Sequence, residues 1–247
     1  MAIVPEHIRF YEDIFGLPEL VRGSVLTIGV QDLRFRGGRP PPESLGDWGH
    51  QIFWRWKLRG KAYAPYNGFR GFDDYLAARG ASAVTTLDFF DERADIKHNL
   101  NEPIPETLKE NFDLVIDVGN TEHVFDTRQC LESLFACVKV GGHLLLHLPV
   151  SGYFAHGLHV FNPQGLIDAL TLNHFESRYR AYSTRRGRYL KRPHPTRDTL
   201  IWLAARKQDH TGPFRVPQQT LWSDYYASPR SQARFKTQRD YWKQAGA

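Results

Sequence analysis

The stretch FDLVIDVGNTEHVFDTRQCLESLFACVKVGGHLLLHLP, residues 112–149, decides the fold. It begins and ends with apolar runs at 112–119 and 141–150, and a segment of helical character lies between them. Strands that are apolar on both faces are typical of parallel sheets covered by helices on both sides. This stretch therefore predicts a strand–helix–strand unit of an α/β protein.

The same alternation continues on either side of this unit. Further strands are predicted at 24–30, 82–90, 94–101, 177–184 and 198–207, and further helices at 6–21, 69–80 and 162–175. The last two strands are joined by a loop without a helix, so they should form an antiparallel pair. The sequence therefore predicts a Rossmann-like, doubly wound, mainly parallel seven-stranded α/β sheet with an antiparallel edge strand.

The chain divides into three segments on this pattern. Residues 1–23 form an N-terminal helical segment, residues 24–209 form the α/β domain, and residues 210–247 form a C-terminal tail. A stretch of about 36–67, rich in Gly, Pro, Trp and Arg, interrupts the domain and is longer than a normal connection. It is expected to be an insertion that covers or binds substrate.

Composition points to a soluble cytoplasmic protein. Hydrophobic residues make up 41% of the 247 residues, and no run approaches the roughly 18 apolar residues of a membrane span. The N-terminus lacks the pattern of a secretory signal. Cys130 and Cys137 are seven residues apart among apolar neighbours, which predicts two buried thiols and neither a disulfide nor a metal site.

The formal net charge of +5 is unevenly distributed. Residues 178–197 contain eight Lys or Arg and no Asp or Glu, and the basic loop at about 184–197 belongs to this segment. Such a segment could bind an acidic partner: nucleic acid, a nucleotide-sugar or a phosphorylated substrate. The alternative is a solvated basic loop without a ligand.

Ligands of open α/β sheets bind at the carboxyl ends of the strands. A dinucleotide would need several glycines after the first strand, and SVLTIGVQDLRF at 24–35 has a single glycine followed by Gln31 and Asp32. NAD is therefore disfavoured. A cofactor that carries an amine in place of a phosphate, such as S-adenosylmethionine, is compatible with these polar side chains.

Several motifs strengthen this interpretation. FDLV is followed by EHV and then KVGGH, NLNEPIP spans 99–105, and HGLHVFNPQGL spans 156–166. With the order of elements, these motifs resemble the class I S-adenosylmethionine-dependent methyltransferases, over residues 24–175. The resemblance is greater to a bacterial branch that has Gln-Asp in place of the glycine-rich loop. S-adenosylmethionine is therefore the expected cofactor.

The resemblance also implies the cofactor-binding residues. Gly29, Val30 and Gln31 would line the methionine end, and Asp88 would bind the ribose. Asn99, with Leu100 beside it, stands where the branch has an aspartate for adenine, so the charge of that residue is lost here. Asp117 and Gly119 would lie beside the transferred methyl group.

The expected acceptor is a small hydroxylated metabolite or a sugar or glycan precursor, with phosphorylation a further option. A hydroxyl nucleophile needs a base, and the well-placed histidines are His123 after the fourth strand and His156 and His159 after the fifth. Of these, His123 and His156 are the candidates for the base. His123 could instead bond to backbone at a helix start, where Glu122 could supply an N-terminal charge. His147 lies inside an apolar strand and is expected in the core, and no metal is expected.

Two other functions remain open. A methyltransferase-fold protein without activity, serving as a binding or scaffold subunit, would explain the single glycine and Asn99. An RNA methyltransferase would explain the basic segment 178–197. Nucleic acid is the less favoured partner, no membrane partner is expected, and the sequence leaves the oligomeric state open.

Overall fold

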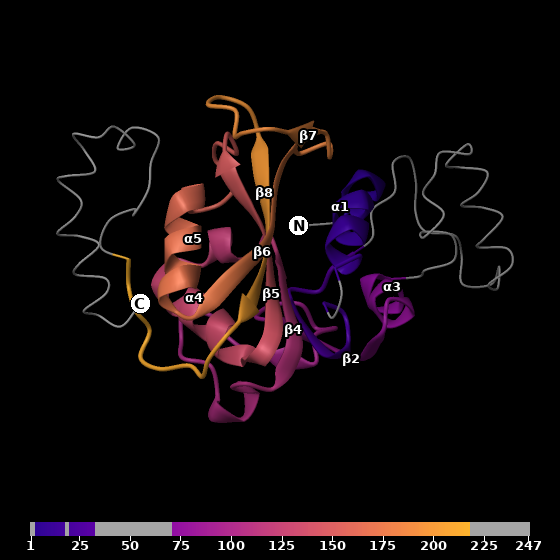
Figure 1. The fold of residues 1–247 in the computed structure, drawn as a ribbon, viewed down its shortest axis with the longest axis vertical. Helices are drawn as coiled ribbons and strands as arrows, with labels where there is room; N and C mark the ends of the chain where they lie inside the picture. Colours follow the sequence, from indigo (N-terminus) through magenta and orange to yellow (C-terminus); the bar gives the residue numbers. More distant parts are fainter. Residues whose placement is uncertain (1–2, 18–19, 33–70, 218–247) are drawn as a thin grey trace, which may run out of the picture.

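The computed structural model describes residues 3–17, 20–32 and 71–217 of the chain (Figure 1). The predicted insertion at 36–67 and residues 218–247 of the predicted C-terminal tail lie outside these ranges.

The described residues form one mixed sheet with the strand order β3-β2-β1-β4-β5-β8-β6-β7. Strands β1 to β5 are parallel to one another, and β8 runs antiparallel between β5 and β6. The predicted doubly wound sheet and its antiparallel pair are confirmed, and the short β7 from the basic loop is an eighth strand. The strands are β1 (Gly23–Ile28), β2 (Ala81–Asp88), β3 (Ile96–Lys97), β4 (Phe112–Val118), β5 (Val138–Ser151), β6 (Phe175–Thr184), β7 (Tyr189–Leu190) and β8 (Thr199–Lys207).

Helices cover both faces of this sheet. α1 (Pro5–Phe15) and α3 (Phe72–Ala78) lie on one side, and α4 (Thr127–Cys137) and α5 (Pro163–Leu172) lie on the other (Figure 1). α1 ends before Gly16, which with Pro18 was expected to break the helical spacing of residues 6–21. α5 begins where the Asn162 side chain accepts hydrogen bonds from the backbone amides of Gln164 and Gly165. Short 3₁₀ turns, η3 (Glu106–Leu108) and η4 (Thr121–His123), flank β4.

The apolar core is divided by the sheet into two layers. In β4, Leu114, Ile116 and Val118 pack in the layer under α1 and α3, whereas Val115 packs in the layer under α4 and α5. This alternation follows from the two-residue period of a strand. Cys130 and Cys137 are both buried free thiols, as predicted.

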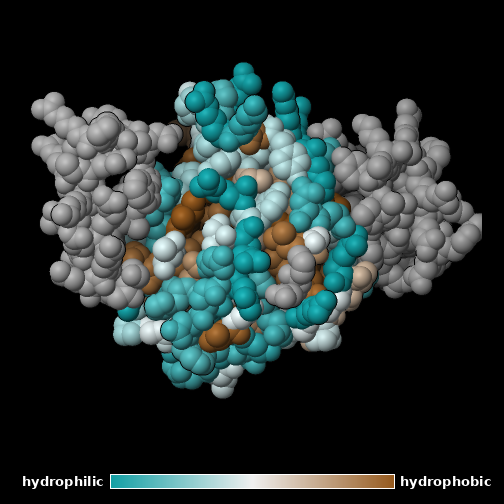
Figure 2. All heavy atoms as spheres, viewed as in Figure 1, coloured by the Kyte–Doolittle hydropathy of each residue, from teal (hydrophilic) through white to brown (hydrophobic). Residues whose placement is uncertain are grey.

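The strand order reverses between β1 and β4, since β2 and β3 extend to one side and β5 to the other. A crevice at the carboxyl ends of the strands opens at such a switch point, which places a ligand site there. In the face shown in Figure 2, apolar side chains reach a mainly hydrophilic surface in separate patches. No described helix is long and apolar enough to span a membrane.

Candidate functional site

A cavity of about 170 Å³ lies at the carboxyl ends of β1, β2 and β4. It brings together five of the ten predicted site residues, Gly29, Asp88, Asn99, Leu100 and His123. The other residues that line it are Ile28, Leu87, Phe89, Phe90, His98, Asn101, Asn120 and Val124. The cavity therefore joins the ends of three adjacent strands in the way that a nucleoside site requires.

Gly29 is the one position in this cavity that only glycine fits. Its φ of +77° is left-handed, and an added Cβ would lie 2.5 Å from Oδ1 of Asn120. The Asn120 side chain itself is fixed, because its Nδ2 donates to the backbone carbonyl of Ile28 at 2.6 Å. The end of β1 and the turn after β4 are thus held against one another.

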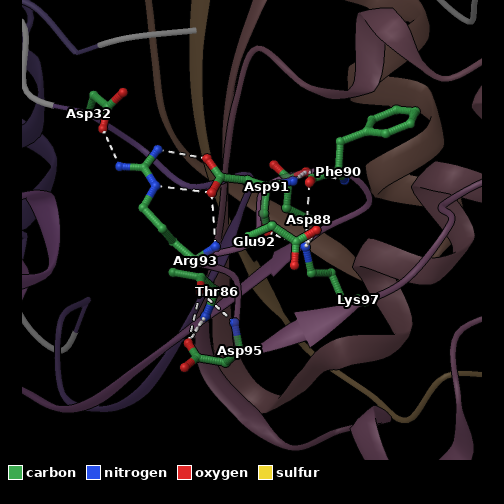
Figure 3. Close-up of polar contacts among 9 residues, drawn as sticks. All are labelled: Asp32, Thr86, Asp88, Phe90, Asp91, Glu92, Arg93, Asp95 and Lys97. Atoms are coloured by element: carbon green, nitrogen blue, oxygen red, sulfur yellow. Dashed lines mark hydrogen bonds and ion pairs between the residues drawn. The ribbon is translucent and has the colours of Figure 1, made fainter.

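Asp88 ends β2 with one carboxylate oxygen engaged. Its Oδ1 accepts hydrogen bonds from the backbone amides of Phe90 at 2.8 Å and Asp91 at 3.0 Å (Figure 3). Its Oδ2 accepts none from the residues that the structure describes. One oxygen therefore shapes the loop after β2, and the other is available to a ligand.

Asp32, whose carboxylate is compatible with a cationic amine, forms an ion pair with the chain itself in the described structure. Nη1 of Arg93 lies 2.9 Å from Oδ1 of Asp32, and Nη2 of the same guanidinium lies 2.6 Å from Oδ2 of Asp91 (Figure 3). The cation that Asp32 binds is thus supplied by the chain. This bridge ties the loop after β1 to the loop after β2.

Gln31 and Val30 are not among the residues that line the cavity. The Gln31 side chain turns back, and its Nε2 donates to the carbonyl of Ile28 at 3.0 Å. Its Oε1 is buried and has no hydrogen-bond partner within the described ranges. A buried acceptor without a donor is costly, so Oε1 is an acceptor left unsatisfied by the described residues.

Asn99 uses its amide within its own loop. Its Oδ1 accepts hydrogen bonds from the backbone N of Asn101 at 3.1 Å and from that residue's Nδ2 at 2.9 Å. Its Nδ2 donates to Glu102 Oε1 at 3.3 Å. Asn99 lines the cavity, and its side chain also closes the turn that contains the buried Leu100.

Asp117 does not line the cavity, although the sequence placed it beside the transferred methyl group. It is fully buried, and its oxygens accept hydrogen bonds from the backbone amides of Asn120 at 2.9 Å and Thr121 at 3.1 Å, and from the Thr121 hydroxyl. Burial raises the pKa of Asp117, and these hydrogen bonds oppose the rise. Its role is to shape the turn, which Gly119 enters with a φ of +70°.

The two predicted histidines meet above a buried carboxyl group. The ring centroids of His123 and His156 are 5.3 Å apart, and Nε2 of His123 lies 4.0 Å from Oε1 of Glu122. Burial and the neighbouring His156 lower the pKa of His123. Glu122 was expected as a helix-start charge, but its side chain is fully buried. Burial and the nearby Asp117 raise the pKa of Glu122 to about 8.

The loop after β5 holds His156 in this position. The backbone amides of Leu158 and His159 donate to the Glu122 carbonyl at 2.8 Å and 3.1 Å. A Cβ at Gly157 would lie 2.9 Å from Cγ of Glu122, so glycine permits the loop to press on this side chain. The loop and η4 therefore form one packed unit.

Comparisons with known proteins were made at the level of family, sequence and structure. No protein-family model matches the chain, and neither does any curated protein sequence. Solved structures that are similar include an S-adenosylmethionine-dependent methyltransferase from Mesorhizobium loti, with 16% identity, a TM-score of 0.44, and coverage of 82% of this chain and 98% of that one.

Two further solved structures are similar over comparable lengths. The YcgJ protein from Bacillus subtilis has 11% identity and a TM-score of 0.46, with 82% of this chain and 99% of that chain covered. The 1,6-didemethyltoxoflavin-N1-methyltransferase from Burkholderia thailandensis, with bound S-adenosylhomocysteine, has 16% identity and a TM-score of 0.43, with coverage of 83% and 77%.

The mainly parallel sheet, with its last strand antiparallel, is the sheet that the sequence resemblance implied. The observed fold is thus a Rossmann-like, mainly parallel α/β sheet. At the cavity, sequence reasoning missed the residues Phe89, Phe90 and Val124 and the buried position of Glu122. The apolar pair of phenylalanines directly after Asp88 was a visible signal, since it follows a predicted strand end.

Proposed function

We propose that this protein is an S-adenosylmethionine-dependent methyltransferase that methylates a hydroxyl group of a small metabolite or of a sugar or glycan precursor. The observation that carries the proposal is the cavity at the ends of β1, β2 and β4. It combines a glycine at the end of β1, an acid at the end of β2 and a histidine after β4, namely Gly29, Asp88 and His123.

The residues around the cavity fit the parts of this cofactor. The second oxygen of Asp88 can accept hydrogen bonds from the ribose hydroxyls, and Gly29 admits a close approach to the backbone. The unpartnered Oε1 of Gln31 can accept a hydrogen bond from the ammonium group. Phe89 and Phe90 offer apolar surface for the adenine ring. Once bound, S-adenosylmethionine supplies a methyl group activated by a sulfonium.

Methyl transfer depends mainly on the alignment of acceptor and methyl group. His123 lines the cavity and His156 lies next to it, so these two imidazoles are placed to engage the acceptor hydroxyl. The lowered pKa of His123 keeps its ring neutral near pH 7, and a neutral ring has a nitrogen that can accept a hydrogen bond.

The basic loop supports an acidic acceptor, such as a phosphorylated sugar. The Ser151 hydroxyl donates to the His194 carbonyl, and the backbone N of Tyr153 donates to Asp198 Oδ1 at 3.2 Å. These bonds fasten the loop to the end of β5, at the same edge of the sheet as the cavity. Arg186 and Arg188 are exposed on this loop. An acceptor screen should therefore compare each hydroxylated compound with its phosphorylated form.

Calorimetric titration with S-adenosylmethionine, S-adenosylhomocysteine and NADH tests the proposal. We expect micromolar binding of the first two and none of NADH. Asp88→Asn keeps the Oδ1 acceptor that shapes the loop and converts Oδ2 into a donor, so it should weaken cofactor binding about 10-fold or more, the size of a lost charge-assisted hydrogen bond. Asp209→Ala, an exposed aspartate after β8, is the matched control and should bind as wild type.

Equal affinity of the Asp88→Asn variant and the wild type would contradict the assigned site. A complete lack of binding at millimolar cofactor would instead favour a methyltransferase-fold scaffold without activity. Tight RNA binding that weakens steeply with salt would favour the RNA methyltransferase.

A further inference from the structure

Three ligand-type side chains converge at the edge of the cavity. Glu122 and His123 come from η4 and His156 comes from the loop after β5, and one ligand atom from each lies within 4.8 Å of the others. The shortest recorded separation is 4.0 Å, between Nε2 of His123 and Oε1 of Glu122. A general base would require one imidazole, whereas two imidazoles and a carboxylate around one point form a ligand set.

Glu122 contributes a buried carboxyl group to this set. Its side chain is fully buried, and neither of its oxygens has a hydrogen-bond partner among the described residues. Asp117, a second buried carboxyl group, acts on it electrostatically. A buried carboxylate without a partner is strongly unfavourable, and a cation between Glu122 and the imidazoles would compensate the charge of Glu122 and of the nearby Asp117.

We propose that Glu122, His123 and His156 bind a divalent first-row transition-metal ion. Imidazole nitrogens suit zinc, iron, nickel and copper, whereas magnesium prefers a shell of oxygen ligands alone. A set of three protein ligands with open positions is also the arrangement of catalytic zinc sites. The ligand class therefore favours an ion such as Zn²⁺ over Mg²⁺.

The two histidine side chains can move to metal-binding distance of Glu122. At metal–ligand distances of about 2.0–2.2 Å, neighbouring ligand atoms of a tetrahedral site lie roughly 3.4 Å apart. His156 is exposed and His123 is about half exposed, with 47% of its side chain accessible, so both rings can rotate toward Glu122. The carboxylate needs no such movement, because Gly157 and the amides that follow it already fix η4.

The role of the ion rests on the proposed function. Its open positions would face the acceptor beside His123, where a bound hydroxyl would lose its proton to solvent more readily. The oxygen would then attack the methyl carbon as the carbon–sulfur bond breaks, giving a methyl ether and S-adenosylhomocysteine. The two histidines would in this case serve as ligands.

Titration of the full chain with Zn²⁺ and with Co²⁺, without any cofactor, tests metal binding separately from the proposed function. We expect one tight Zn²⁺ site and visible absorption bands from bound Co²⁺. His156→Ala alters an exposed side chain and should weaken Zn²⁺ binding at least about 10-fold, as loss of a ligand requires. Glu122→Gln should do the same and abolish the Co²⁺ bands.

His159→Ala provides the matched control, because this neighbouring half-buried histidine bonds to the Phe125 carbonyl and lies outside the ligand set. It should bind Zn²⁺ as wild type. Equal Zn²⁺ affinity of wild type, His156→Ala and His123→Ala would overturn the proposal, as would displacement of Zn²⁺ by an equal concentration of Mg²⁺. A protein that binds S-adenosylmethionine but no Zn²⁺ would contradict this inference and leave the proposed function standing. A protein that binds Zn²⁺ but no S-adenosylmethionine would contradict the proposed function alone.

Discussion

Gly29 shows how one residue controls the candidate site. The strand before it is an ordinary buried strand, and the loop after it lacks the glycines of a dinucleotide site. The single glycine is nevertheless required, because the chain turns there with a positive φ and Asn120 occupies the space of a side chain. The end of β1 therefore needs this one glycine, and the polar residues Gln31 and Asp32 follow it in the loop.

Substitution of this glycine tests that interpretation. Gly29→Ala should lower the free energy of unfolding by about 1–3 kcal/mol, because alanine must adopt a left-handed conformation and displace the Asn120 amide. It should also weaken S-adenosylmethionine binding in the calorimeter. Gly212→Ala is the control, since an added Cβ there meets nothing within 4 Å. Unchanged stability and binding in Gly29→Ala would contradict the required turn.

At the scale of elements, the end of α4 depends on a buried lysine from β8. Nζ of Lys207 donates to the carbonyl of Val138 at 2.7 Å and to that of Phe135 at 3.3 Å, and it lies 3.1 Å from Glu110 Oε1. The side chain is only 1% exposed. It thus satisfies carbonyls at the carboxyl end of the helix, where a cation is favourable.

Removal of this ammonium should loosen the junction of α4 and β5. Lys207→Met should lower the free energy of unfolding by about 2–3 kcal/mol, because buried carbonyls and a carboxylate lose their partner. Chemical denaturation monitored by circular dichroism measures the loss. Lys109→Met, which breaks an exposed ion pair with Glu106, should change stability by less than about 1 kcal/mol. Equal losses of stability in Lys207→Met and Lys109→Met would refute the stabilising role of the buried Lys207 ammonium.

At the scale of the whole molecule, α1 is docked on the sheet through aromatic rings. The His147 ring stacks on Trp202 with ring centroids 3.6 Å apart, which confirms the predicted place of His147 in the core. The ring of His7, from α1, contacts the His147 ring edge to face, with centroids 4.9 Å apart. His7 also bonds to the Arg185 carbonyl of the basic loop at 3.2 Å. The N-terminal helix, the sheet and the basic loop therefore share one packed centre.

This centre should make the fold sensitive to acid. Burial lowers the pKa of His7 to about 4 from 6.5, and burial also lowers the pKa of His147. Between pH 6.5 and pH 4 the unfolded chain binds more protons than the folded one. The contribution of His7 to the free energy of unfolding should therefore be greatest above pH 6.5 and decrease as the pH falls toward 4. The titration of His7 alone should lower the free energy of unfolding by about 2 kcal/mol between pH 7 and pH 5.

Urea denaturation at pH 7 and pH 5 measures this fall. His7→Gln keeps a donor for the Arg185 carbonyl and removes the titrating ring, so its loss of stability on acidification should be smaller by about 2 kcal/mol. His98→Gln, at a half-buried position of the loop after β3, is the control. Equal loss of stability on acidification in His7→Gln and in wild type would exclude His7 as the cause of the acid sensitivity.

The sequence by itself determined the α/β alternation, the antiparallel pair and the strand ends that face the cavity. It could do so because apolar runs, and the turn residues that end them, are local features of a sequence. Parallel strands also bring their carboxyl ends to one edge of the sheet. Asp88 and His123 were found in this way. Only the tertiary structure decided that Asp117 turns inward, that Asp32 is bound by Arg93, and that Glu122 lies buried beneath two histidines. These outcomes depend on burial and on partners distant in sequence, which no local pattern records.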